Sequence, residues 1–171
     1  MRHGTSSPTV DRPGSEQDRK AHLLKLATTV VAATFLLVGV AGFIPGLTTN
    51  VDNLEIVGHD HANMGEQAEL LGIFHVSVLH NIVHLAFGAV GLAMARSVRG
   101  ASTYLVGGAI IYALVLVYGV VVDQESDANF LPVNTADNWL HGGLVVGMLA
   151  LALALTPSRR SSIVRREDAN D

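Results

Sequence analysis

The sequence of 171 residues contains no cysteine. This absence excludes disulfide bonds, thiolate nucleophiles, iron–sulfur clusters, covalently attached haem and zinc sites with cysteine ligands. A redox function would therefore need a cofactor that histidine ligates or that the protein holds without a covalent bond.

Recognisable catalytic motifs are absent as well. The chain has no glycine-rich phosphate loop, nucleophile elbow, pair of acid–base carboxylates or carboxylate-rich metal loop. We therefore assign no catalytic residue, and the sequence favours a protein that is not an enzyme. Basic residues gather only in the tails and one short link, so we expect no nucleic-acid partner.

Charged residues are scarce, at 15% of the chain, whereas hydrophobic residues make up 49%. The apolar residues form four long runs instead of recurring periodically, which is typical of a membrane protein. A helix of about 20 residues crosses the hydrocarbon core of a bilayer, and backbone groups in lipid must be hydrogen-bonded within the segment. We therefore predict an all-α membrane domain at residues 22–157, with four transmembrane helices at about residues 23–44, 70–96, 101–122 and 137–156.

Polar segments flank this predicted domain. Residues 1–21 are rich in serine, proline, glycine and charge, with too little apolar content to fold alone. We predict that they form a disordered cytoplasmic tail. Residues 158–171 are predicted to form a basic tail that is also cytoplasmic.

Lysine and arginine are missing from two connectors, at residues 48–69 and 123–137, although both connectors carry acidic residues. All 11 basic side chains lie in the N-terminal tail or the start of its helix, in the link at Arg96 and Arg99, or in the C-terminal tail. Cytoplasmic loops of membrane proteins carry an excess of lysine and arginine. The distribution predicts an up-down-up-down bundle in a cytoplasmic membrane, with both termini in the cytoplasm and both connectors outside.

The second predicted helix carries polar residues on one face. Ser77, His80, Asn81 and His84 fall within about a third of the helix circumference at ~100° per residue, and His75 points the other way. A polar side chain that faces lipid has no hydrogen-bond partner, so this face should contact other helices. The predicted polar seam includes similar residues near the start of the fourth helix. It consists of Ser77, His80, Asn81, His84, Asn134, Asp137, Asn138 and His141.

The sequence contains a weak internal repeat. Asn81 and His84 are three residues apart in the second predicted helix, and Asn138 and His141 have the same spacing at the start of the fourth. Four crossings make two hairpins with the same orientation, so the spacing fits two repeated helical hairpins. It also fits packing alone, since residues three apart share a helix face.

The polar seam has three interpretations. In the first, histidine and asparagine hydrogen-bond across helices as a structural clamp, worth about 0.6 to 2 kcal/mol for each bond. In the second, His80, His84 and His141 ligate haem, or bind zinc, iron or copper together with Asp137, because imidazoles one turn apart can share one ion. In the third, the seam is a path for protons or a small substrate.

Two further features bear on a cofactor. At 1.5 Å per residue, His84 lies ~18 Å from Arg96 and His141 lies ~27 Å from Arg159, so the two histidines would not be level unless a helix tilts. This difference in depth argues against haem. Outside the membrane, a weaker cation site consists of His59, Asp60 and His61 in the first acidic connector.

Two stretches of the chain carry a recognisable pattern. They resemble the signature motifs of a bacterial membrane family, domain of unknown function 4383. The two stretches are residues 72–85, followed by Phe87 and Gly88, and residues 131–141. The resemblance implies a four-helix integral membrane protein and, as the family's description says, no known activity. The matching motif positions in this chain are His75, His80, Asn81, His84, Asn134, Asp137, Asn138 and His141.

The favoured hypothesis is a structural or accessory membrane protein whose polar seam fixes helix registry, in the lipid bilayer and within a homo-oligomer or a larger membrane complex. The alternatives are a histidine-ligated haem or metal redox protein and a transporter of protons or a small substrate. No cofactor is predicted, and haem and a divalent metal stay open.

Overall fold

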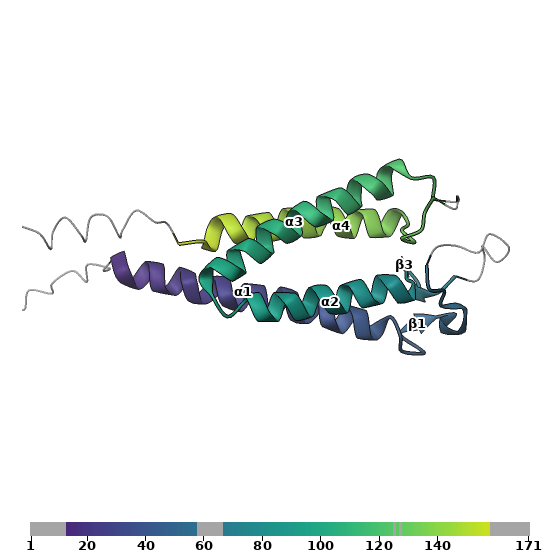
Figure 1. Cartoon of the computed structure of the whole chain (residues 1–171), viewed down its shortest axis with the longest axis horizontal. Coiled ribbons are helices and arrows are strands. Elements are labelled where there is room, and N and C mark those ends of the chain that lie inside the picture. Colours follow the sequence, from purple (N-terminus) through teal and green to yellow (C-terminus); the bar gives the residue numbers. More distant parts are fainter. Residues whose placement is uncertain (1–12, 58–66, 125, 127, 158–171) are drawn as a thin grey trace, which may run out of the picture.

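The computed structural model describes residues 13–57, 67–124, 126 and 128–157. The chain is mostly helical, with four helices in the described part: α1 (Pro13–Ala41), α2 (Val78–Met94), α3 (Val98–Val121) and α4 (Thr135–Leu155) (Figure 1). Helices α1, α3 and α4 are long and apolar enough to cross a membrane, whereas α2 is a shorter apolar helix. The start of α1, the link between α2 and α3, and the end of α4 lie at one end of the molecule (Figure 1).

Helix α1 begins earlier than the apolar run does. The prediction of a disordered tail through residue 21 was wrong for residues 13–21, which are helical. Pro13 occupies the first helical position, where a missing N–H and a fixed φ are tolerated. Glu16 lies in the first turn, near the positive end of the helix dipole, and pairs with Lys20 at 3.3 Å. Residues 1–12 and the predicted basic tail at 158–171 lie outside the described residues.

Helix α2 begins at Val78, so the predicted start near Leu70 was wrong. Leu71 and Gly72 both adopt positive φ angles, 57° and 66°, which an α-helix does not contain. They turn the chain between strands β2 (Glu69–Leu70) and β3 (Phe74–His75). Ser77 then caps the helix, because its hydroxyl accepts the N–H of His80 at 3.1 Å. The β2–β3 hairpin and a shorter helix α2 therefore lie where one long helix was predicted.

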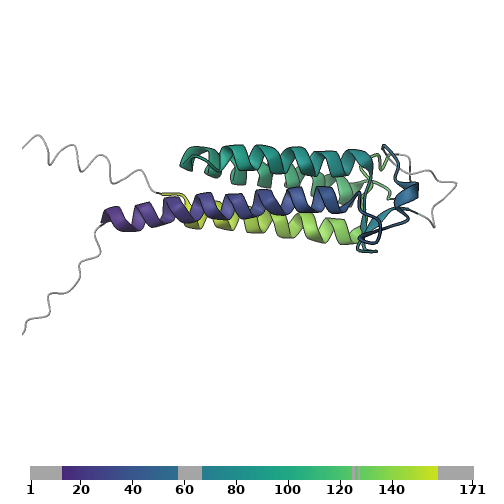
Figure 2. The ribbon, with the colours of Figure 1, turned by 90° about the horizontal axis from the view of Figure 1, so that it is seen from below.

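A small antiparallel sheet covers one end of the helices (Figures 1 and 2). Strand β1 (Thr48–Thr49), followed by the short 3-10 helix η1 (Val51–Asn53), completes the order β1-β2-β3. Leu70 pairs with Thr48 on one side and with Phe74 on the other. Ala68, Leu70 and Val76 are buried and pack with partly buried residues of α1, including Val38. The sheet is thereby fixed to the end of α1.

The four helices run side by side along the long axis of the molecule (Figure 2). Helix α1 packs closely against α2, and α3 packs closely against α4, whereas α2 and α3 make few contacts with each other. Figure 1 shows α2 and α3 diverging from their short link toward the end that carries the sheet. Helices α3 and α4 begin and end within three residues of their predicted ranges.

The main core lies between α1, α3 and α4, and α2 closes it with small residues. A β-carbon at Gly88 would lie only 2.7 Å from the backbone oxygen of Ala32, so α1 and α2 approach each other directly at this point. The buried residues of this core are Leu24, Ala32, Phe35, Ala101, Tyr104, Leu105, Ala109, Tyr112, Met148 and Ala152.

Candidate functional site

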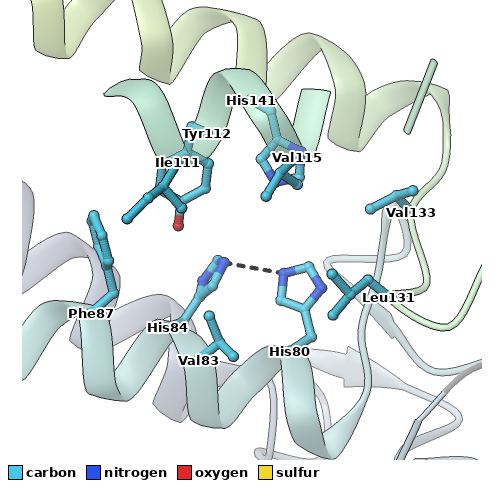
Figure 3. Close-up of a pocket in the computed structure, with 10 residues that line it drawn as sticks. All are labelled: His80, Val83, His84, Phe87, Ile111, Tyr112, Val115, Leu131, Val133 and His141. Atoms are coloured by element: carbon cyan, nitrogen blue, oxygen red, sulfur yellow. Dashed lines mark hydrogen bonds between the residues drawn. The ribbon is translucent and has the colours of Figure 1, made fainter. Parts of the chain in front are cut away.

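Three histidines of the predicted polar seam surround one cavity. His80 and His84 lie on successive turns of α2, with their Nε2 atoms 3.1 Å apart. His141 points toward this pair from α4, across the cavity (Figure 3). Both His84 and His141 are buried. The structure therefore gathers imidazoles from two helices that are nearly 60 residues apart in sequence.

His84 and His141 line this cavity together, although their distances from the nearest basic residues predict different depths. The difference arises because that prediction counted residues from Arg96 and Arg159, at the ends where α4 continues further than α2. Counted from the opposite ends, each histidine lies seven residues after its helix N-cap, Ser77 in one case and Asn134 in the other. The two N-caps thus set the histidines at the same level.

The cavity has a volume of about 70 Å³ and lies between α2, α3 and α4. Its walls are mostly apolar, and no Asp, Glu, Lys or Arg among the described residues lines it. Val83 of α2 and Ile111 of α3 both line the cavity and are about half exposed, which places its opening between these two helices. The lining residues are His80, Val83, His84, Phe87, Ile111, Tyr112, Val115, Leu131, Val133 and His141.

A loop between α3 and α4 covers the cavity with Leu131 and Val133. Asn129 holds this loop, because its amide donates to the carbonyl of Val133 at 3.1 Å and accepts the Val133 N–H at 3.3 Å. The hydroxyl of Tyr118 donates to the carbonyl of Ala128 at 2.7 Å. Sequence reasoning missed this loop, since no local pattern links it to the histidines.

Aromatic rings pack behind the imidazoles. Phe35 of α1 and Tyr112 of α3 stack with ring centroids 5.3 Å apart. Phe35 also meets His84 edge-on at 5.4 Å, and Tyr112 lies 5.4 Å from the ring of His141. The sequence analysis did not single out Phe35. The sequence does contain a pattern that relates Phe35 to Tyr112: each aromatic residue precedes a glycine by seven residues, Gly42 in one case and Gly119 in the other.

The two seam asparagines lie against glycines at the ends of neighbouring helices: Gly119 in the last turn of α3, and Gly42 directly after α1. The Asn138 side chain donates to the carbonyl of Gly119 at 2.8 Å, and a β-carbon at Gly119 would collide with the amide. Asn81 occupies the same relation to Gly42, where a β-carbon would also collide with the amide. The Nδ2 of Asn81 is buried and has no hydrogen-bond partner among the described residues. Only Asn138 therefore makes the interhelical bond expected of a clamp.

Asp137 belongs to the sheet end of the molecule and does not line the cavity. Its carboxylate accepts the N–H of Asn134 at 3.0 Å and that of His75, in β3, at 3.3 Å. Its own N–H donates to the Asn134 side chain at 3.0 Å, which completes a capping box for α4. Asn134 also donates to the carbonyl of Ile73 at 2.7 Å. Asp137 is buried, and these bonds join α4 to the β2–β3 hairpin.

The geometry limits what the site can do chemically. Among the described residues, no group of three or more histidine, aspartate or glutamate side chains is arranged to hold a metal ion. The weaker candidates His59, Asp60 and His61 lie outside the described residues. On β3, His75 faces Glu69 at 3.3 Å, away from the cavity. A neutral imidazole donates one hydrogen bond and accepts another, so the cavity is suited to hydrogen-bond a neutral ligand.

The comparison with protein families extends the resemblance seen in the motifs. A family described as Domain of unknown function (DUF4383) matches residues 25–154, which include the greater part of α1, all of α2 and α3, α4 up to residue 154 and every residue that lines the cavity. Neither the curated proteins nor the solved structures gave a significant match. Because the family match spans most of the sequence, the chain belongs to the DUF4383 family.

Proposed function

We propose that the chain is an integral protein of a bacterial cytoplasmic membrane in which all four helices cross, up-down-up-down, with both termini in the cytoplasm. The basic residues support this orientation: Arg19, Lys20 and Lys25 lie near the start of α1, and Arg96 and Arg99 flank the start of α3. Both connectors at the other end are free of lysine and arginine. At 1.5 Å per residue, the 17 residues of α2 extend about 25 Å, close to the hydrocarbon thickness.

Reporter fusions test this orientation. A reporter that is active only in the cytoplasm should be active at the N-terminus, at the C-terminus and in the link between α2 and α3. It should be inactive when inserted at Asp52 or after Asp123, in the two acidic connectors. Activity at one terminus but not at the other would mean an odd number of crossings and would overturn the proposed topology.

We also propose that the chain consists of two repeated helical hairpins, α1–α2 and α3–α4. Three features described above recur in both hairpins and support a duplication. The second helix of each hairpin begins at a polar N-cap. Its asparagine lies against a glycine at the end of the first helix, and its histidine ring contacts an aromatic ring of the first helix. An axis along the membrane normal would relate the two hairpins.

The role that the geometry supports best is that of a structural or accessory membrane protein, in a homo-oligomer or a larger complex. This proposal depends on one observation: side chains of the polar seam hydrogen-bond to the backbone of neighbouring elements. Asn138 binds the backbone of α3, and Asp137 and Asn134 bind the β2–β3 hairpin. A Soret band or a stoichiometric metal in the gently purified protein would overturn this role.

Replacing Asn138 by alanine is expected to lower the stability of the detergent-solubilised protein by about 1 kcal/mol, because an interhelical hydrogen bond in the membrane region is lost. Thermal unfolding of both proteins measures the difference. Thr34→Ala is the control, since the exposed Thr34 hydroxyl binds only the Val30 carbonyl of its own helix, at 3.0 Å. Equal melting temperatures for Asn138→Ala and Thr34→Ala would remove the basis for a clamp.

A further inference from the structure

Two polar groups face the cavity without a hydrogen-bond partner. The Tyr112 hydroxyl points into the cavity from α3 (Figure 3). The His141 ring faces it from α4, and neither side chain makes a hydrogen bond within the described part of the chain, although each is at least 95% buried. Buried polar groups in proteins are nearly always hydrogen-bonded. The hydroxyls of Thr28 and Tyr104 also lack a partner among the described residues, but they do not line the cavity. Tyr112 and His141 do line it, so these two groups indicate a ligand with polar atoms.

The remaining walls restrict what that ligand can be. Within the part of the chain that the structure describes, no Asp, Glu, Lys or Arg lines the cavity, and moving an ion from water into such an apolar space is strongly unfavourable. The opening lies at Val83 and Ile111, on the surface between α2 and α3 that faces lipid in the proposed orientation. A ligand that enters here is dissolved in the membrane. It is therefore neutral and largely apolar.

Hydrogen-bonding groups also lie on the opposite wall. His80 and His84 of α2 face Tyr112 and His141 across the cavity (Figure 3). A matching ligand carries an oxygen atom on each of two opposite sides. Because the cavity holds only about 70 Å³, its ring lies partly in the opening between Val83 and Ile111. Because imidazole and hydroxyl groups can each donate or accept, they suit both the carbonyl oxygens of a quinone and the hydroxyl groups of a quinol.

We propose that this cavity binds the headgroup of a membrane quinone, with one oxygen held by Tyr112 and His141. The other oxygen accepts a hydrogen bond from His80 or His84, in place of the bond that joins their Nε2 atoms. The isoprenoid tail leaves between Val83 and Ile111 into the lipid. This inference concerns binding only. It goes beyond the structural role and does not depend on it.

The test is a binding titration of the full-length protein in detergent with menadione, a naphthoquinone without a long tail. The chain has no cysteine, so thiol addition to the quinone cannot imitate binding. Methylnaphthalene has a similar ring system but no carbonyl oxygens. We expect saturable binding of one menadione per chain, and binding of methylnaphthalene that is weaker by at least about fivefold, as the loss of hydrogen bonds predicts.

Two pairs of variants locate the site. Tyr112→Phe removes only the hydroxyl group and should raise the Kd for menadione about fivefold. Tyr104→Phe is its control, because Tyr104 is equally buried but does not line the cavity, and its Kd should stay within about twofold of the parent value. Ile111→Trp narrows the opening and should raise the Kd at least about tenfold. The neighbouring Ile110→Trp, at an exposed position outside the cavity, should not.

The proposal is overturned by any of three results. The first is the absence of saturable menadione binding. The second is a methylnaphthalene affinity equal to that of menadione, which would make the site an apolar void. The third is an equal shift in the two members of each pair, which would place binding elsewhere on the protein or in the micelle. Ile111 is half exposed, so Ile111→Trp still reports on the site if a core variant does not fold.

Discussion

Replacing Gly88 by leucine is expected to lower the stability of the protein by about 3 kcal/mol, which is a fall of about 6 to 12 °C in melting temperature for a chain of this size. A β-carbon at this position would lie 2.7 Å from the backbone oxygen of Ala32 and 2.7 Å from Cγ of Leu36. The backbone oxygen cannot move aside without shifting α1. The variant must therefore separate α1 from α2, and the cavity that α2 lines would be distorted as well.

Gly143→Leu is the matched control for this prediction. Gly143 lies within α4, and a β-carbon there would have no atom within 4 Å among the described residues. Leucine has a higher helix propensity than glycine by about 0.5 to 1 kcal/mol, so this variant should be as stable as the parent or slightly more stable. Thermal unfolding in the same detergent compares the two. A similar loss in both variants would show that close packing of α1 on α2 is not the cause.

Replacing Asp137 by alanine is the second change with a large expected effect, a loss of about 3 kcal/mol. The carboxylate is buried and accepts two backbone N–H groups, from Asn134 and from His75. Alanine would leave both donors without that acceptor and would remove the capping box of α4. The β2–β3 hairpin would lose its bond to α4, so hydrogen exchange should rise first at His75 and its neighbours.

Two further variants check this reasoning about Asp137. Asp137→Asn keeps one acceptor oxygen in place and should lose about half as much stability as Asp137→Ala. Asp52→Ala removes an exposed carboxylate from the first connector and should change stability by no more than about 0.5 kcal/mol. If Asp137→Ala melted like Asp52→Ala, the carboxylate would not be joining the hairpin to α4.

The polar residues discussed above, from the seam and from the cavity wall, fall into two groups with different surroundings. The first group hydrogen-bonds to backbone groups of neighbouring elements, as a structural role requires. It consists of Asp137, Asn134 and Asn138. Tyr112 and His141 face a cavity without a hydrogen-bond partner in the described part of the chain. A single protein can hold both groups because the first stabilises the helix ends, while the second lies where α2 and α3 diverge.

The residue pattern was a reliable guide to helix number and a poorer guide to helix ends. The apolar runs predicted helices close to α3 and α4, since each run follows a polar residue, Ser97 or Asn134, whose side chain caps the helix. The run that begins at Leu70 was assigned to one helix, although Leu71 and Gly72 turn the chain with positive φ angles. Leucine rarely adopts such an angle, so nothing in the local sequence predicted this turn.

The sequence by itself determined that the chain has long apolar helices, that its basic residues are confined to a few segments, and that polar residues share one face of α2. Each of these properties depends on neighbours along the chain. Only the tertiary structure decided that His80, His84, Tyr112 and His141 surround one cavity and that Asp137 does not. The reason is physical: which side chains meet across helices depends on where glycines let two backbones approach and where two helices diverge, and neither is encoded in the spacing within a single helix.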